Sequence, residues 1–302
     1  MLKINLEICI CTYKRKNYLT DLLDSIYNAT IPVNTNLGII VVDNDPDKSA
    51  LNIIENFKKR NNQIKIKYFH EKNRGISFAR NRSIKEAINE KCEVIAFLDD
   101  DETIKDNWIE IMIRNYMTNP EKIILGSVTP VFEETPPLWI KNSTYYHKPK
   151  APLTANALFS INKIKHMDYP LDKKYALTGG SDTHLKIRLL REGSELLYVK
   201  DAEVFEKIPL SRANGQWILN RAFRTGYTAA LIEKDLFGFK GVLKRIVIIT
   251  LRIIAIPVML TRYFSKNKKR KIDFLININK IKGNLYGLIN GEYYEYQKTH
   301  GN

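Results

Sequence analysis

The chain has 302 residues, of which 48 are Lys or Arg and 33 are Asp or Glu, so its formal net charge is +15. A hydrophobic content of 44%, with only 14 Gly and 11 Pro, excludes collagen-like, low-complexity and wholly disordered proteins. The three cysteines (Cys9, Cys11 and Cys92) are too few for a disulfide framework and lack the spacing of a zinc site, so we interpret them as core residues of a reduced, intracellular protein.

Short apolar runs alternate with amphipathic patterns over the first hundred residues. Strands are predicted at 6–11, 37–42, 64–69 and 93–98. The first, second and fourth are apolar almost throughout, which is typical of strands covered on both faces. Apolar residues at helical spacing predict helices near 18–26, 50–57 and 84–88. The alternation predicts an α/β fold with a mostly parallel sheet flanked by helices.

Functional side chains are concentrated directly after these strands. Thr12 and Arg15 follow the first strand, Asp43 ends the second, Arg74 follows the third, and the acidic run DDDE (99–102) follows the fourth. In parallel α/β sheets, ligands bind outside the carboxyl ends of the strands. We therefore expect these carboxylates, arginines and hydroxyls to converge on one edge of the sheet and to form the site.

The run DDDE predicts a bound cation. Adjacent carboxylates repel each other unless positive charge is present, and a hard divalent cation such as Mg²⁺ or Mn²⁺ is the usual partner of such ligands. We expect this cation, rather than the protein, to supply the positive charge; a solvated acidic loop is the alternative. The patterns GxGxxG and GxxxxGK[ST] are absent, which argues against a dinucleotide-dependent dehydrogenase and a P-loop NTPase.

A second compact motif, TGGSDTHLKIRLLREG, lies at 178–193. Its two glycines open a predicted helix, and Asp182 falls in the first turn, where the helix dipole favours a negative charge. An aspartate that only caps the helix is the alternative. Because no Gly- or Ser-rich linker precedes Phe205, residues 1–215 are predicted to form one catalytic domain, followed by a helical C-terminal region at 216–302.

The positive charge is concentrated near the C-terminus. Residues 236–272 contain ten Lys or Arg and no acidic residue, and they enclose an apolar segment at 246–260. This segment is shorter than the roughly 20 residues of a spanning helix, and it is interrupted by Arg252 and Pro257. We predict a segment lying on or shallowly inserted in an anionic membrane surface; a buried core helix with a basic tail is the alternative. Aromatic residues are not interleaved with the cations, so no nucleic-acid partner is expected.

The motifs ICTYKR, VVDN, NRGISFARN, FLDDDE and TGGSDTHL occur in this order over about residues 4 to 215. Together they resemble a family 2 glycosyltransferase with the Rossmann-like GT-A fold. The later motif RAFRTG (221–226) is similar to that of members that build bacterial surface polysaccharides. The resemblance implies inverting transfer of a sugar from a nucleotide diphosphate, with a UDP-sugar favoured, to an acceptor hydroxyl. It divides the catalytic domain into a nucleotide-sugar-binding half (1–102) and an acceptor-binding half (103–215).

The resemblance also implies roles for individual residues near the donor. Thr12, Arg15 and Arg74 would border the nucleotide, and Asp43 would accept a hydrogen bond from the base. The D-x-D element would place Asp101 on the metal ion, Mn²⁺ or Mg²⁺. Asp99 of the same element would lie nearer the ribose and serve as a further metal ligand.

Asp182 matches the position of the general base of the family. Two departures from the family pattern are visible: Ser181 replaces the acid that commonly precedes the base, and Glu206 stands where many relatives have a histidine metal ligand. Glu206 is therefore a candidate third ligand.

On the acceptor side, we expect contacts from Trp139, which lies in an aromatic stretch, from Asn156 and from His184. Aromatic faces stack on sugar rings but also pack in cores, and a lone histidine on a helix is commonly structural.

The predicted acceptor is a saccharide or a lipid-linked saccharide. We expect a cytoplasmic protein that is peripherally associated with the inner face of the membrane through its C-terminal region. Two alternatives are a nucleotidyltransferase of sugar-nucleotide metabolism and a non-catalytic membrane-associated scaffold with the same fold. The first is disfavoured because CTYKRKN, after the first strand, lacks a glycine.

Overall fold

The structure of the chain is a computed structural model that describes residues 3–147, 153–264, 268–289, 291 and 293–294. Its strands are β1 (Ile4–Thr12), β2 (Thr35–Asp43), β3 (Lys65–His70), β4 (Val94–Asp99), β5 (Glu102–Ile104), β6 (Ile123–Phe132), β7 (Ala157–Ser160) and β8 (Leu196–Ile208). Its helices are α1 (Lys16–Asn28), α2 (Leu51–Arg60), α3 (Ile76–Asn89), α4 (Trp108–Thr118), α5 (Leu138–Lys141), α6 (Thr144–His147), α7 (Ser181–Arg191), α8 (Gly215–Ile254), α9 (Ile256–Tyr263) and α10 (Lys268–Leu288).

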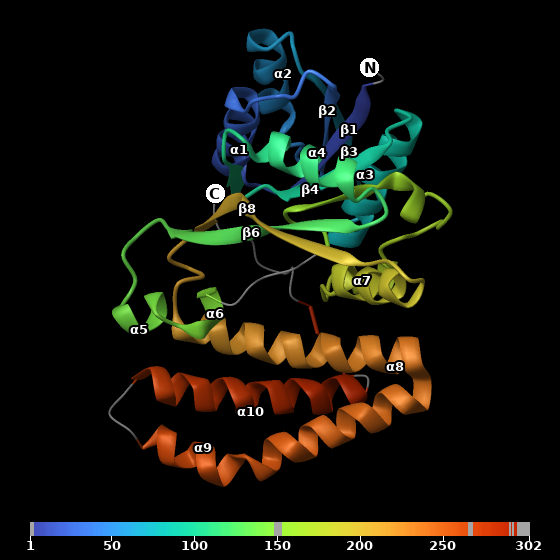
Figure 1. Ribbon diagram of the computed structural model, residues 1–302. Coiled ribbons are helices and arrows are strands. Elements are labelled where there is room, and N and C mark those ends of the chain that lie inside the picture. Colours follow the sequence, from blue (N-terminus) through green and yellow to red (C-terminus); the bar gives the residue numbers. More distant parts are fainter. Residues whose placement is uncertain (1–2, 148–152, 265–267, 290, 292, 295–302) are drawn as a thin grey trace.

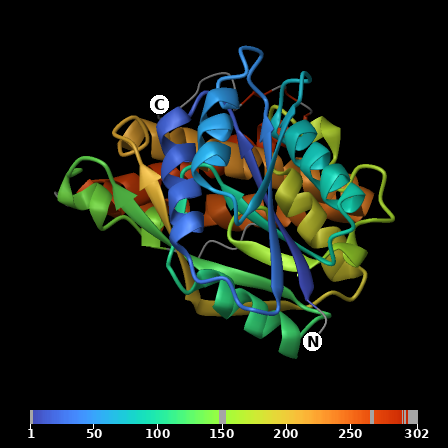
Figure 2. The ribbon, with the colours of Figure 1, turned by 90° about the horizontal axis from the view of Figure 1, so that it is seen from above.

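The strands form one mixed sheet in the order β3-β2-β1-β4-β7-β6-β8-β5. The first four strands in this order are parallel, β7 is antiparallel to both β4 and β6, and β6 and β8 are parallel. The four strands predicted from apolar runs are all present, and α1, α2 and α3 occupy the crossovers between them. The α/β prediction is therefore confirmed, with antiparallel strands added in the second half (Figure 2).

Helices cover both faces of the sheet, as the apolar strands require. On one face α1, α2 and α4 pack against β1 residues Leu6, Ile8 and Ile10. On the other face α3 and α7 pack against Cys9 and its neighbours. Successive side chains of β1 thus point into two different apolar cores, which explains why the strand is apolar without alternation.

Three helices at the C-terminal end form a stack below the sheet (Figure 1). The long helix α8 changes direction at Gly238, whose φ of 54° and ψ of −132° are not helical. Helix α10 lies between the two arms of α8: a Cβ on Gly283 would meet the Phe223 carbonyl oxygen, and Arg245 donates a hydrogen bond to Asn284. Among the described helices, none combines the length and the apolar character needed to cross a membrane.

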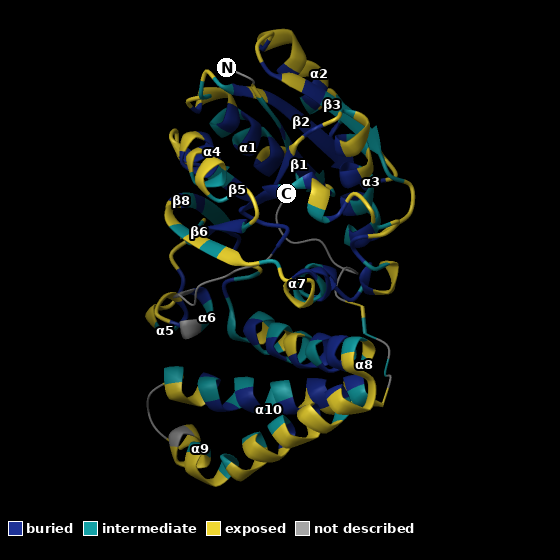
Figure 3. Ribbon diagram, turned by 45° about the vertical axis from the view of Figure 1, so that its right-hand side comes forward, coloured by how far each residue is buried: buried dark blue, intermediate teal, exposed yellow. Residues whose placement is uncertain are grey.

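The predicted basic apolar segment forms the outer layer of this stack, at the end of α8 and in α9 (Figure 3). Leu251, Ile254 and Val258 are 61%, 66% and 69% exposed, so the segment is not a buried core helix. Not all of its cations face outward, however. Arg245 is buried against Glu233 at 2.6 Å, and Arg252 donates to Asn277 at 2.7 Å. Part of the local positive charge therefore holds the helical stack together.

Candidate functional site

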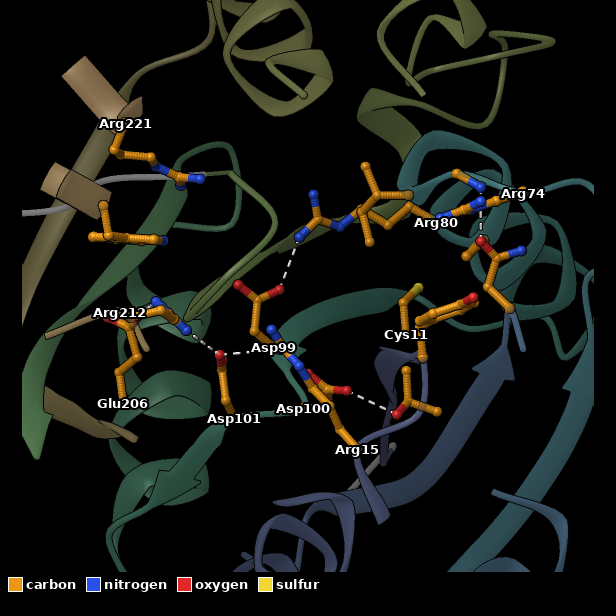
Figure 4. Close-up of a pocket in the computed structure, with 17 residues that line it drawn as sticks. Cys11, Arg15, Arg74, Arg80, Asp99, Asp100, Asp101, Glu206, Arg212 and Arg221 are labelled. Carbon is orange, nitrogen blue, oxygen red and sulfur yellow. Dashed lines mark hydrogen bonds and ion pairs between the residues drawn. The ribbon is translucent and has the colours of Figure 1, made fainter. Parts of the chain in front are cut away.

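A pocket lies where the carboxyl ends of β1 and β4 meet the start of α3 and the start of α8 (Figure 4). The strand register brings the predicted residues together, because Thr12 pairs with Asp43 across β1 and β2, and Cys11 pairs with Asp99 across β1 and β4. The lining includes four acidic residues and five arginines: Asp99, Asp100, Asp101, Glu206, Arg15, Arg74, Arg80, Arg212 and Arg221. Of the residues expected at this sheet edge, Thr12, Arg15, Arg74 and Asp99 to Asp101 thus line one pocket, whereas Asp43 and Glu102 do not.

Arginines of the protein pair with every carboxylate of the run 99–101. Arg80 donates to Asp99 at 2.8 Å, and Arg15 donates to Asp100 at 2.8 Å and to Asp101 at 3.1 Å. Arg212 donates to Asp101 at 2.7 Å as well. The protein therefore supplies positive charge to this run itself, which the expectation of a bound cation as the positive partner did not include.

Burial and neighbouring charges perturb the titration of Asp99 and Asp100. Burial raises the pKa of Asp99 to about 6; Arg80 opposes this shift, and Asp101 adds to it. Burial also raises the pKa of Asp100, against the effect of Arg15. Burial alone would lower the pKa of Arg15, but Asp100 and Asp101 outweigh it and raise this pKa. Strongly coupled charges of this kind are typical of sites that bind charged ligands.

The carboxylates on this wall also suit a divalent cation. Asp99, Asp101 and Glu206 all line the pocket, and β5 pairs with β8 so that Glu102 stands opposite Glu206. Their oxygens are the hard ligands that Mg²⁺ and Mn²⁺ prefer. The chemistry of these donors therefore suits the expected cation, but their atoms are not gathered around one point. The three-ligand cluster that the described residues form within 4.8 Å is Asp172, His184 and Asp235, and Asp101 already accepts from two guanidinium groups.

Arg74 and Asp43, the two other residues predicted to contact the nucleotide, differ in their position relative to the pocket. Arg74 lines the pocket, and its guanidinium lies 6.0 Å from the ring centroid of Tyr13. Asp43 is fully buried and does not line the pocket: its oxygens accept from the amides of Asp45 at 2.9 Å and Ala50 at 2.8 Å. The following residue, Asn44, lines the pocket instead and holds the start of α3 by accepting from the Gly75 amide at 2.8 Å.

Asp182 lies in the first turn of α7, as predicted, and is partly exposed. It does not line the pocket itself. Gly179, with φ of 74°, precedes it, and a Cβ at this glycine would lie 2.6 Å from a guanidinium nitrogen of Arg224 on α8. The double glycine therefore allows the start of α7 to lie directly against α8, one turn beyond Arg221, which lines the pocket.

The residues expected on the acceptor side lie outside the pocket. Asn156 is 1% exposed, accepts from the Trp108 indole at 2.8 Å and donates to two backbone carbonyls. Its amide is thus engaged in the fold, and an acceptor contact by Asn156 is not supported. Trp139 is half-buried against Gly215 in a cluster with Tyr145 and Trp217.

His184 is buried beside Tyr175, and its Nε2 lies 3.1 Å from Asp235. Burial lowers the pKa of His184, and Asp235 opposes this shift. Asp172, His184 and Asp235 bring ligand atoms within 4.8 Å of one another. Lys174 forms an ion pair with Asp235 in this cluster, so the ammonium group of Lys174 already supplies positive charge there.

Four further charged or aromatic pocket residues were not assigned to the site from the sequence: Arg80, Arg212, Trp217 and Arg221. Arg80 lies on α3 and donates to Asp99. Arg212 and Trp217 lie between β8 and the first turn of α8, outside any recognised motif. Arg221, which also lines the pocket, belongs to the motif RAFRTG, which the sequence analysis had not connected with the site.

Comparisons with known proteins agree with this architecture. A family model described as glycosyl transferase family 2 matches residues 7–175. Succinoglycan biosynthesis protein ExoM of Rhizobium meliloti is 28% identical over 233 residues, which cover 74% of each chain. Glucosyl-dolichyl phosphate glucuronosyltransferase of Haloferax volcanii is 22% identical over 260 residues, which cover 76% of this chain and 78% of the relative.

Two solved structures share the fold at low identity. Mannosyltransferase PcManGT of Pyrobaculum calidifontis, in complex with GDP-Man and Mn²⁺, has a TM-score of 0.64 at 13% identity, covering 97% of this chain and 89% of its own. TarS of S. aureus, in complex with UDP-GlcNAc, has a TM-score of 0.54 at 14% identity, covering 96% and 93%. The fold is of the predicted GT-A type, with a helical C-terminal region. Because the family model spans more than half of the chain, the protein belongs to glycosyl transferase family 2.

Proposed function

We propose that the protein transfers a sugar, with inversion, from a nucleotide diphosphate to a hydroxyl of a saccharide or lipid-linked saccharide. A UDP-sugar is the favoured donor. The observation that carries this proposal is the pocket in which Asp99, Asp100 and Asp101 meet arginines from four segments of the chain. Such a site can neutralise a leaving diphosphate while holding the nucleotide at the carboxyl ends of the strands. The similarity to ExoM favours a role in surface polysaccharide synthesis.

In this proposal the donor lies across β1 and β4. Thr12 and Arg15 border the nucleotide, and Arg74, over the Tyr13 ring, faces it from the start of α3. Asp99 and Asp101, with Glu206 as a third candidate, would hold Mn²⁺ or Mg²⁺. That cation supplies electrostatic stabilisation of the diphosphate as it leaves.

Asp182 is assigned as the general base. Its carboxylate takes the proton of the acceptor hydroxyl while the acceptor oxygen forms a bond to the anomeric carbon and the bond from this carbon to the diphosphate breaks. The support is its place at the start of α7, where Gly179 packs against Arg224 of α8.

The C-terminal helices are assigned to an anionic membrane surface at the cytoplasmic face, where a lipid-linked acceptor would be presented. The division of the chain follows: residues 1–215 form the catalytic unit and 216–302 the membrane-associating region, although Trp217 and Arg221 complete the pocket from the second part. The support is the outward apolar face of α8 and α9 near exposed Lys240 and Lys244. Apolar insertion combined with cationic attraction is how interfacial helices bind anionic lipid.

A donor screen tests the proposed activity. The purified protein is incubated with UDP- and GDP-linked sugars and Mn²⁺, and release of the free nucleoside diphosphate is measured. We expect slow hydrolysis of one donor class and loss of this hydrolysis in Asp101→Asn. If no nucleotide-sugar is consumed, the proposal is wrong. Conversion of a sugar phosphate and a nucleoside triphosphate would also contradict it and would favour the nucleotidyltransferase alternative.

A further inference from the structure

Arg212 lies between two carboxylates that belong to the candidate cation site. Its guanidinium donates to Asp101 at 2.7 Å and to Glu206 at 2.5 Å (Figure 4). The Arg212 and Glu206 side chains are 12% exposed and the Asp101 side chain 7%, so this bridge is largely shielded from water. A single guanidinium therefore occupies the position, between the two carboxylates, in which a shared divalent cation would be expected.

Arg212 differs in this respect from the other arginines of the acidic cluster. Arg15 also donates to Asp101, but it has Asp100 as a second partner, and Arg80 donates to the Thr154 carbonyl as well as to Asp99. Both carboxylates that accept from Arg212 are candidate cation ligands. A cation bound there would repel its guanidinium from both partners at once.

The backbone of Arg212 is fixed, so a response to ligand would come from its side chain. Its amide donates to the Pro209 carbonyl at 2.8 Å, and its carbonyl accepts from the Tyr146 hydroxyl at 2.6 Å. The guanidinium lies 5.3 Å from the ring centroid of Trp217, and the guanidinium of Arg221 lies 5.9 Å from the same ring. The guanidinium groups of Arg212 and Arg221 therefore both lie close to the Trp217 ring, on the same side of the pocket.

We propose that Arg212 is a diphosphate-binding residue which, before the donor binds, stands in for the divalent cation between Asp101 and Glu206. When the cation and nucleotide bind, the guanidinium leaves these carboxylates and pairs with phosphate oxygens, beside Arg221 on Trp217. A planar guanidinium is suited to both partners, since carboxylate and phosphate each accept its paired N–H groups. The inference rests on the proposed function for the nature of the ligand.

The test measures two affinities in one variant, because the proposal predicts that they change in opposite directions. Binding of Mn²⁺ alone is measured from the electron paramagnetic resonance signal of the free ion, and binding of UDP or GDP with Mg²⁺ by calorimetry. In Arg212→Ala, Mn²⁺ should bind several-fold more tightly because one guanidinium no longer competes with it for Asp101 and Glu206. The Mg²⁺-nucleotide should bind about tenfold or more weakly because a charge-assisted contact is lost. Arg82→Ala, which removes an arginine paired with Glu86 on α3, is the matched control and should change neither affinity.

Arg212→Lys controls for a folding defect, because it keeps the positive charge. It should also bind Mn²⁺ more tightly and the Mg²⁺-nucleotide more weakly, but by smaller factors than Arg212→Ala. Trp217 fluorescence adds a third readout: Mg²⁺-UDP should shift the emission of the parent protein, and both Trp217→Phe and Arg212→Ala should lack the shift. A loss of both affinities, a change in neither, or tighter Mn²⁺ binding with unchanged nucleotide binding would overturn the inference. If the parent protein binds neither nucleotide with metal, the proposed function itself fails.

Discussion

The hydroxyl of Thr12 donates a 2.8 Å hydrogen bond to Asp100, which lies 88 residues later in the chain. This contact joins the end of β1 to the turn after β4, and Arg15 reinforces it by donating to the other oxygen of Asp100. Asp100 thus has a different task from the acids on either side of it. It holds two walls of the pocket together, while Asp99 and Asp101 are the proposed cation ligands.

The first prediction concerns this link. Asp100→Ala should lower the free energy of unfolding by about 3 kcal/mol, because it leaves the partly buried guanidinium of Arg15 with one carboxylate partner fewer and the Thr12 hydroxyl without its acceptor. Urea unfolding at neutral pH measures the loss. The matched control is Asp47→Ala, which removes an exposed partner of Lys14 and should cost about 0–1 kcal/mol. Equal losses in the two variants would show that the Asp100 contacts do not carry the stability assigned to them.

The second prediction tests Asp101 as a ligand of the cation. Asp101→Asn should reduce the transfer rate by about 10²-fold or more, because one charged ligand at the leaving diphosphate is lost. The affinity for Mn²⁺, measured by electron paramagnetic resonance of the free ion, should fall in parallel. Glu203→Gln, on the same strand as Glu206 but paired with Lys105 outside the pocket, serves as the control. A variant that keeps normal Mn²⁺ affinity would exclude Asp101 as a ligand.

The third prediction tests the general base. Asp182→Asn should reduce transfer by about 10²–10⁴-fold while donor affinity stays unchanged within error, because the carboxylate acts on the acceptor proton and not on the nucleotide. Glu192→Gln, at the exposed C-terminal end of the same helix, should leave both quantities unchanged. Initial rates and calorimetry of the same samples provide the comparison. Near-normal turnover in Asp182→Asn would remove this residue as the base.

The fourth prediction follows from Glu7 on β1, where burial raises the pKa of the carboxyl group to about 7; Glu90 adds to this shift and Lys65 opposes it. The folded protein therefore binds more protons at Glu7 than the unfolded chain does between about pH 4.5 and 7. Glu7 thus destabilises the fold as pH rises through this range, by about 3 kcal/mol at most. Glu7→Gln should gain stability relative to the parent at about pH 8 but not at about pH 4. A stability difference that does not vary with pH in urea unfolding would contradict the assignment.

The fifth prediction concerns the outer face of α8 and α9. Replacing Leu251, Ile254 and Val258 together by Ser should reduce binding to vesicles containing phosphatidylglycerol about tenfold or more, since these exposed side chains would supply the apolar insertion. Cosedimentation measures the bound fraction. Leu190→Ser, an exposed leucine on α7, is the control and should not change binding. Vesicle binding of the parent that is absent, or that survives the triple change, would refute a membrane role for this face.

Much of the fold could be predicted from the sequence because its information is local. The apolar runs of β1, β2 and β4 and the helical spacing of α1 to α3 are visible in short windows, and parallel topology then places Thr12 and Asp99 at one edge. The antiparallel strand β7 and the order β6-β8-β5 depend on contacts between distant segments, and no local pattern indicated them.

The part of the pocket formed by Arg212, Trp217 and Arg221 also depends on contacts between distant segments. Arg212 and Trp217 reach the pocket only because β8 pairs with β5 and β6, which carries the start of α8 toward the acidic run. Likewise, Arg245 and Arg252 were counted with the membrane-facing charges because the sequence does not reveal that α10 packs against them. Contacts between residues that are far apart in the chain could therefore not be predicted from local sequence patterns.

The central claim is that the acid and arginine pocket binds a nucleoside diphosphate together with a divalent cation. Calorimetric titration of the full chain with UDP and GDP, in Mn²⁺ and then in EDTA, tests it most directly. We predict that one diphosphate binds one site per chain, about tenfold or more tightly with Mn²⁺ than in EDTA, and more tightly than its triphosphate. Failure of both diphosphates to bind, or tighter binding of the triphosphate, would contradict the account.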